Sequence, residues 1–342
     1  MSMDALVMQM SLRSKLKRSK TQKGKSYLIA VDGSNLSMRA VKLAGFLAHP
    51  FDRIKVFSIQ DGASTSLDEY KNVLKTMCKR PTLANCEFEM VQLKAEYKDC
   101  VSGQMVEYAN QHPTSILILG AAGRKMEDAE KTAGKRRSGE APLGSVAKAC
   151  VARVIGPVIL VKKKATPDID DEAKLRARTQ DTGSAGSAGI HIMCCVDGST
   201  LSQRCIDYAT HIAQEGDIVS VLFVRDTDKA MINASHAANA KLGESKVEST
   251  YRDQITKLDE CTPNTTFRFS TKNKHGSIPD TILEVSESDD HPADIILLGS
   301  VQLAKVGSDG EAISLGSVSA VVLQKTGAHP IIVKNFATAA MT

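Results

Sequence analysis

The residues best placed to do chemistry lie in two copies of one motif, Val-Asp-Gly-Ser-x-Leu-Ser-x-Arg, at residues 31–39 and 196–204. We call it the turn motif. In each copy the motif follows a short apolar run and precedes an amphipathic stretch, which predicts a strand that ends in a tight turn and opens a helix. A helix N-terminus offers free backbone N–H groups and a partial positive charge, which suit an anion such as phosphate. The motif therefore predicts an anion-facing turn in each half of the chain.

Two further segments repeat in the same order as the turn motif. An apolar run that ends in glycine occurs at 115–120 and 294–299, and Leu-Gly-Ser-Val occurs at 143–146 and 315–318. A carboxylate, a glycine loop and a Gly-Ser helix start can share the binding of a nucleotide. The carboxylate accepts hydrogen bonds from sugar or base, while backbone N–H groups and the serine hydroxyl donate to phosphate oxygens. The repeated order indicates a tandem duplication.

Each of these elements also has a purely structural interpretation. Asp32 and Asp197 could brace their turns by accepting backbone N–H bonds, and Ser34 and Ser199 are suited to cap helices. Only the joint occurrence of the elements in one order favours a binding site. The sequence shows no nucleophile–base pair, no metal-ligand cluster and no Walker lysine, and neither first strand is followed by a Rossmann glycine pattern. We therefore expect no dedicated catalyst.

The elements that must position these residues alternate between strand and helix in both halves. Apolar runs such as 295–298 lack the alternation of half-exposed strands, which is typical of a parallel sheet covered on both faces. Five such units in each half predict an α/β fold of two flavodoxin-like, doubly wound domains, each with a five-stranded parallel sheet. Ligands bind such sheets at the carboxyl ends of the strands, at the switch point. Asp32, Gly120 and Gly144 should meet there.

The expected elements follow one plan in both halves. Strands are expected at 27–31, 53–59, 86–93, 115–119 and 158–161, and again at 191–196, 218–224, 266–270, 294–298 and 331–333. Helices are expected at 37–48, 67–78, 101–110 and 146–153, and again at 202–214, 244–260, 278–286 and 318–325.

Changes in composition divide the chain into domains and connecting segments. We expect a basic disordered tail at 1–26, a first domain at 27–163, a flexible linker at 164–189, a second domain at 190–336 and a short tail at 337–342. Either domain is long enough to bury a hydrophobic core of its own.

The charge of the chain is concentrated in the N-terminal tail. The whole chain has a net charge of +5, and residues 1–26 alone have a net charge of +6. The rest of the chain therefore has a net charge of −1. We therefore expect no nucleic-acid binding except through that tail. No apolar run approaches the roughly 20 residues that span a bilayer, and no secretory signal is recognisable, which favours a cytoplasmic location and no membrane partner. The eight cysteines lack paired spacing and are expected to be buried thiols.

The turn motif, the Gly-x-x-Gly after the fourth strand and the Gly-Ser-Val helix start together resemble the universal stress protein family. The likeness covers both halves and leaves out the tail and the linker. It implies the adenine nucleotide alpha-hydrolase-like fold, a stress-response or signalling role, and binding of ATP or AMP, with Mg as a further option. It also implies an intramolecular pseudo-dimer that pairs through the last strands, 158–161 and 331–333, and leaves homo-oligomers open. Because no base is visible to activate water, any ATP hydrolysis should be slow.

The resemblance implies one nucleotide site in each half, with the aspartate on the adenosine side and the later Gly-Ser on the phosphates. The first site consists of Asp32, Gly33, Ser34, Ile59, Gly120, Gly123, Arg124, Gly144, Ser145 and Val146. The second consists of Asp197, Gly198, Ser199, Val224, Gly299, Gly316, Ser317 and Val318.

Both glycine loops depart from the family pattern, in which nine residues separate Gly-x-x-Gly from Gly-Ser or Gly-Thr. In the first half twenty residues separate Gly123 from Gly144, and this insertion, about 124–142, forms either a solvated loop or a basic lid over the phosphates. In the second half Gln302 replaces the second glycine, and its side chain would crowd the phosphates. We therefore rank the first site above the second. The alternative function is a nucleotide-free scaffold of the same fold that serves protein interaction.

Overall fold

The structure is a computed structural model of the 342-residue chain. It describes residues 24–48, 51–60, 68–78, 87–94, 101–123, 143–162, 189–214, 216–226, 234–261, 265–274, 276–288, 292–300, 303–304 and 313–334. The expected insertion at 124–142 and the expected tail at 337–342 lie outside these ranges. So do the expected N-terminal tail up to residue 23 and the expected linker up to residue 188.

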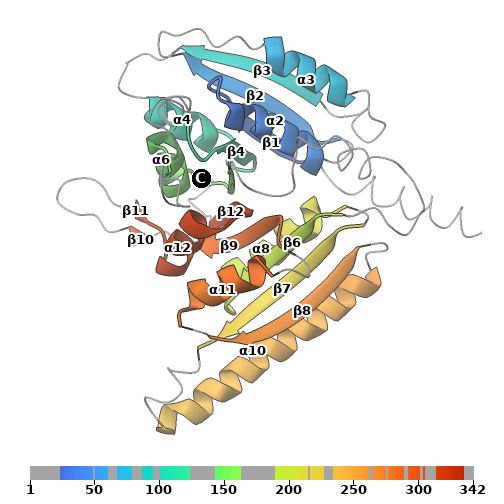
Figure 1. The fold of residues 1–342 in the computed structure, drawn as a ribbon, viewed down its shortest axis with the longest axis vertical. Helices are drawn as coiled ribbons and strands as arrows, with labels where there is room; N and C mark the ends of the chain where they lie inside the picture. The colour runs from blue at the N-terminus through green and yellow to red at the C-terminus, as the bar shows by residue number, and fades with distance from the viewer. Residues whose placement is uncertain are drawn as a thin grey trace, which may run out of the picture.

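One sheet of ten strands runs through both halves in the order β3-β2-β1-β4-β5-β12-β9-β6-β7-β8 (Figure 1). The first half supplies β1 (Ser26–Ala30), β2 (Arg53–Gln60), β3 (Glu87–Lys94), β4 (Ile116–Gly120) and β5 (Val158–Val161). The second half supplies β6 (His191–Val196), β7 (Ile218–Arg225), β8 (Thr266–Asn273), β9 (Ile295–Ser300) and β12 (His329–Lys334). Neighbouring strands within each half are parallel, which confirms the predicted doubly wound α/β fold.

Helices cover both faces of this sheet. Buried residues of α2 (Asn35–Leu47), α3 (Asp68–Cys78), α8 (Thr200–Ile212) and α10 (Ala234–Cys261) form the core on one face. Buried residues of α4 (Val101–Asn110), α6 (Ser145–Arg153), α11 (Ile278–Ser286) and α12 (Ser317–Lys325) form the core on the other. Successive strand residues point to opposite faces, so Cys194 enters the first core and Cys195 packs against the second. This covering explains why the strands are apolar throughout.

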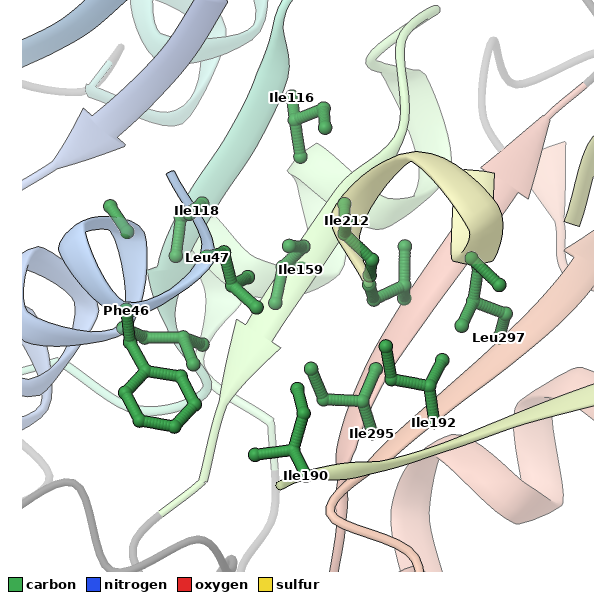
Figure 2. Packing of buried hydrophobic residues seen from close by; sticks show 14 of the residues in the cluster. Phe46, Leu47, Ile116, Ile118, Ile159, Ile190, Ile192, Ile212, Ile295 and Leu297 are labelled. Atoms are coloured by element: carbon green, nitrogen blue, oxygen red, sulfur yellow. The ribbon is translucent and has the colours of Figure 1, made fainter. Parts of the chain in front are cut away.

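The two halves meet where β5 pairs with β12, and we call this region the junction. The pairing is antiparallel, with Ile159 opposite Ile331 and Val158 opposite Ile332. The core on the α2 and α8 face continues across it: Figure 2 shows Leu47 and Ile159 of the first half near Ile190 and Ile295 of the second. The halves therefore share one hydrophobic layer as well as one sheet.

Most predicted elements match the structure to within a few residues, with two exceptions. Helix α10 begins at Ala234, ten residues before the predicted start, in a stretch of small and polar residues that carries no helical periodicity. A short antiparallel hairpin of β10 (Leu303–Ala304) and β11 (Ile313–Ser314) lies between β9 and α12 and was not predicted. Among the described residues, no helix has the length and apolar composition needed to cross a bilayer.

Candidate functional site

The first turn motif forms the turn between β1 and α2. Gly33 has a φ of 83°, which glycine adopts without strain. Ser34 caps α2, its hydroxyl oxygen accepting a hydrogen bond of 3.1 Å from the Ser37 N–H. Asp32 Oδ1 accepts a hydrogen bond of 3.0 Å from the Ser34 N–H. One oxygen of this exposed carboxylate therefore braces the turn, as the structural interpretation predicts.

The other oxygen of Asp32 lies against the glycine loop that follows β4. A Cβ atom built on Gly123 would lie 2.9 Å from Asp32 Oδ2, so any side chain at this position would displace the carboxylate. The Gly144 N–H donates a hydrogen bond of 2.8 Å to the Ala121 carbonyl, which joins the start of α6 to the same loop. The structure therefore brings Asp32, Gly123 and Gly144 together at the carboxyl ends of β1 and β4.

The N-terminus of α6 faces this loop and carries no acidic side chain. Gly144 is the N-cap, with a φ of −61° and no side-chain hydrogen bond to the helix, and the first turn holds no acidic residue. Ser145 is exposed and Val146 is half-buried. The first turn therefore presents its partial positive charge without a capping side chain.

The remaining predicted residues of the first half have mixed positions. Gly120 serves packing, because a Cβ atom there would lie 2.8 Å from the Leu36 Cβ of α2. Ile59 is buried near the end of β2. Arg124 lies outside the described residues.

The second turn motif repeats the backbone of the first, but its aspartate has different partners. Gly198 has a φ of 87°, and the Ser199 hydroxyl accepts a hydrogen bond of 3.3 Å from the Ser202 N–H. Asp197 Oδ1 accepts hydrogen bonds of 2.9 Å from the Ser199 N–H and 2.6 Å from the Ser202 hydroxyl. Burial raises the pKa of Asp197, but the hydrogen bonds from Ser199 and Ser202 outweigh it and hold this pKa below its usual value.

Helix α10 packs on the second turn, and the Cβ positions of Gly299 and Gly316 do not contact Asp197. A Cβ atom on Gly198 would lie 3.1 Å from Val247 Cγ2 of α10. Gly299 lies against Leu201, as Gly120 lies against Leu36, and Gly316 has open space around its Cα.

The other predicted residues of the second half lie in β7 and at the start of α12. Ser317 is exposed at the start of α12, and Val318 and Val224 are half-buried. Gln302, the residue that replaces the second glycine, lies outside the described residues.

One tyrosine in each half contacts the turn, and the sequence analysis does not include either of them. The Tyr70 hydroxyl of α3 accepts a hydrogen bond of 3.1 Å from the Gly33 N–H and lies 2.7 Å from Ser37 Oγ. Tyr251 of α10 lies near the Ser202 hydroxyl and the Gly198 backbone, and both of these groups lower the pKa of its phenol. Burial raises the pKa of both phenols. The sequence does contain a signal that could have pointed to them, because the helix after the second strand of each half carries a tyrosine.

The first half can therefore contact two parts of one ligand. The Asp32 carboxylate can accept hydrogen bonds from hydroxyl or amino groups, while the glycine loop and the α6 N-terminus can donate to an anion. The space that a Cβ atom at Gly123 would fill is suited to a close backbone approach. Within the described residues, no three histidine, cysteine or acidic side chains group to hold a metal ion.

Comparison with known proteins finds one family model that matches the second half of the chain. Residues 191–334, from β6 to β12, match the model of the Universal stress protein family. No curated protein matches the chain.

Solved structures of the same kind of fold are similar at low sequence identity. A universal stress protein from Archaeoglobus fulgidus DSM 4304 is 14% identical over 91% of this chain and 96% of that chain, with a TM-score of 0.47. Universal stress protein UspA from Lactobacillus plantarum is 16% identical over 41% of this chain and 99% of that chain, with a TM-score of 0.27. The cytoplasmic domain of a prokaryotic cation chloride cotransporter is 11% identical over 91% of this chain and 95% of that chain, with a TM-score of 0.42.

Proposed function

We propose that the chain is a tandem universal stress protein whose first half binds an adenine nucleotide, ATP or AMP. The match of residues 191–334 to the model of that family supports the family part of this proposal. The observation that supports this most directly is the 2.9 Å approach between Asp32 Oδ2 and the Cβ position of Gly123. It brings a carboxylate and a glycine loop to one place at the carboxyl ends of the strands, where doubly wound sheets bind ligands.

In this proposal different residues of the first half contact different parts of the nucleotide. Asp32 Oδ1 stays with the Ser34 N–H and holds the turn, while Oδ2 accepts a hydrogen bond from the adenosine. The backbone of Gly123 and Gly144 and the exposed Ser145 hydroxyl approach the phosphates. Any Mg would enter with ATP, bound to its phosphates.

We propose that the second half binds nucleotide more weakly or serves protein interaction. Two observations support this ranking. Asp197 Oδ1 accepts the Ser202 hydroxyl at 2.6 Å in addition to the Ser199 N–H at 2.9 Å, so two groups of its own turn hold this carboxylate in place. Val247 of α10 also lies over Gly198, at 3.1 Å from its Cβ position, and narrows the approach to the turn.

The proposed role is that of a stress-response or signalling module that acts by binding. The described part of the site offers carboxylate, backbone and serine groups, and the proposal assigns none of them to activating water. Hydrolysis of ATP is therefore expected to be slow, and the nucleotide would act by stabilising one conformation of the chain.

The test is nucleotide binding by the full-length chain. The protein is purified without added nucleotide, bound small molecules are released and identified, and ATP and AMP are titrated by calorimetry. We expect Asp32→Ala to weaken binding about tenfold or more, because it removes a hydrogen bond from a charged group. Asp32→Asn keeps an acceptor for the Ser34 N–H and separates turn bracing from the charge. Asp197→Ala is the matched variant and should change binding far less.

Two results would overturn these assignments. A wild-type protein that neither carries nor binds adenine nucleotide at millimolar concentration ends the proposal and leaves the protein-interaction scaffold. A larger loss for Asp197→Ala than for Asp32→Ala reverses the ranking of the sites.

A further inference from the structure

A lysine from the last strand of each half reaches across the junction to the last helix of the other half. Lys162, directly after β5, donates Nζ hydrogen bonds of 3.1 and 2.8 Å to the carbonyls of Gln324 and Thr326, at the C-terminus of α12. Lys334, the last residue of β12, donates Nζ hydrogen bonds to two carbonyls at the C-terminus of α6. We call Lys162 and Lys334 the clasp lysines.

The chemistry of both contacts is that of a helix C-cap. The last carbonyls of a helix lack partners within the helix and carry a partial negative charge, so a lysine ammonium group stabilises them. Lys334 contacts Cys150 O at 3.2 Å and Val154 O at 2.5 Å and is 1% exposed. A lysine this buried fixes the end of α6 relative to β12.

The last residue of each turn motif holds the backbone of the clasp lysine in its own half. Arg39 of α2 donates a hydrogen bond of 3.5 Å to the Lys162 carbonyl, and Arg204 of α8 donates one of 3.2 Å to the Lys334 carbonyl. Both arginines occupy the ninth position of the motif. The proposed nucleotide contacts do not involve them, so this repeated position has a different task.

These contacts form one chain in each direction. In the second half, α8 begins at the turn, Arg204 holds Lys334, and Lys334 holds the C-terminus of α6. The other end of α6 is the Gly144 N-cap in the first candidate site, about 14 Å away for nine residues. The reverse chain runs from α2 through Lys162 to α12, whose N-cap is Gly316.

We propose that this reciprocal relay couples the two candidate sites, so that the turn of each half positions the Gly-Ser helix start of the other half. The continuous core in Figure 2 supports it, because the hydrophobic layer on the α2 and α8 face crosses the junction without a break. Figure 1 shows α6 and α12 on either side of the junction, and their buried residues share one core. The relay rests on the proposed function only in that its ligand is a nucleotide.

The first test needs no nucleotide. Amide hydrogen exchange is measured on the full-length chain for wild type, Lys334→Met and Lys162→Met. Lys334→Met should speed exchange along α6, up to the Gly144 amide that bonds Ala121, by about fivefold or more while sparing α12. Lys162→Met should do the reverse. Arg204→Gln keeps Lys334 itself and serves as a milder variant, which should still loosen α6 in the opposite half.

Three outcomes of this test refute the relay. The first is faster exchange confined to the carbonyl-bonded end of α6, between residues 150 and 154. The second is an equal rise in both helices, which indicates general loosening. The third is an Arg204→Gln variant that affects α8 but leaves α6 unchanged.

The second test titrates ATP against the same variants. Lys334→Met should weaken ATP binding at the Asp32 site by about fivefold or more, in the range of ordinary coupling between sites, and Lys162→Met should not. If the wild type binds no nucleotide, the proposed function fails and hydrogen exchange alone decides the relay. If ATP binds in an Asp32-dependent way but Lys334→Met changes neither affinity nor α6 exchange, the relay is refuted and the proposed function stands.

Discussion

The contact between the glycine loop and Asp32 allows a single methyl group to test the first site. In Gly123→Ala the new Cβ atom would lie 2.9 Å from Asp32 Oδ2, which is shorter than side chains tolerate. The carboxylate must then move by about half an ångström to reach the 3.4 Å of ordinary contact. The φ of Gly123 is not positive, so alanine adopts this backbone without strain. The substitution therefore acts on the site and leaves the fold in place.

The size of the effect follows from the hydrogen bond that Asp32 would lose. A hydrogen bond to a charged group contributes about 1.5–3 kcal/mol, so ATP binding should weaken by roughly tenfold to hundredfold. The free energy of unfolding should change by less than about 1 kcal/mol, because alanine also lowers the entropy of the unfolded chain. Gly316→Ala is the matched control: its Cβ atom meets nothing within 4 Å, and both binding and unfolding should stay near wild type.

The assay is ATP titration by calorimetry, combined with urea unfolding of the same preparations. A double-mutant cycle with Asp32→Ala identifies the cause: once the carboxylate is absent, Gly123→Ala should cost nothing further. Two results would refute the reasoning. One is unchanged affinity in Gly123→Ala, and the other is a loss of equal size in both backgrounds, which would place the damage in the loop backbone rather than in Asp32.

Three further predictions concern the turns and one strained residue. Tyr70→Phe removes the acceptor of the Gly33 N–H and should lower the free energy of unfolding by about 1–2 kcal/mol, measured by urea denaturation with an unchanged m-value. Because the pKa of Asp197 is lowered in the folded state, its contribution to stability is present above its unfolded pKa of about 3.9 and is lost as pH falls through the folded pKa. Ser202→Ala removes one of the hydrogen bonds that lower this pKa, so an NMR titration should show a higher pKa for Asp197. The loss of stability should then begin at a higher pH. Phe51 has a φ of 75° at the turn before β2, where the second half has Gly216 with a φ of 87°. Phe51→Gly should therefore keep or raise the melting temperature. Gly216→Ala should lower the melting temperature, because it should reduce the free energy of unfolding by about 1 kcal/mol.

The fold could be predicted from the sequence because its strongest signals are local. The apolar runs and the turn motif each predict an element within a window of ten to twenty residues, and the duplication repeats that evidence in the other half. Helices α4 and α11 match their predicted bounds. The early start of α10 and the β10–β11 hairpin were not predicted. Apolar periodicity is weak in both segments, and periodicity is the signal from which the other elements were predicted.

The candidate site was predictable only as far as each half repeats a motif. The motif predicts that Asp32 and Gly144 lie at one edge of the sheet, because parallel strands place their carboxyl ends together. It does not show that Tyr70 holds the Gly33 N–H, since that contact depends on how α3 packs on α2. The clasp lysines were missed for the same reason. Lys162 and Gln324 are 162 residues apart, and only the junction brings them together.

The two turns show how one motif can give two different sites. Both copies contain the same Asp-Gly-Ser and a serine three positions after the cap. In the first, the Ser37 hydroxyl donates to the Ser34 carbonyl at 2.8 Å and contacts Tyr70. In the second, the Ser202 hydroxyl donates to Asp197 instead, at 2.6 Å.

Both aspartates brace their turns, and the position of one serine hydroxyl adds a second hydrogen bond within the turn at Asp197. The difference cannot come from the motif, because the motif is the same. It comes from the neighbours that the rest of each half supplies: the Gly123 loop beside Asp32, and α10 with Val247 over Gly198. If the relay holds, the second turn keeps a use even without a ligand. Its Arg204 still fixes Lys334, and through Lys334 the helix on which the first site depends.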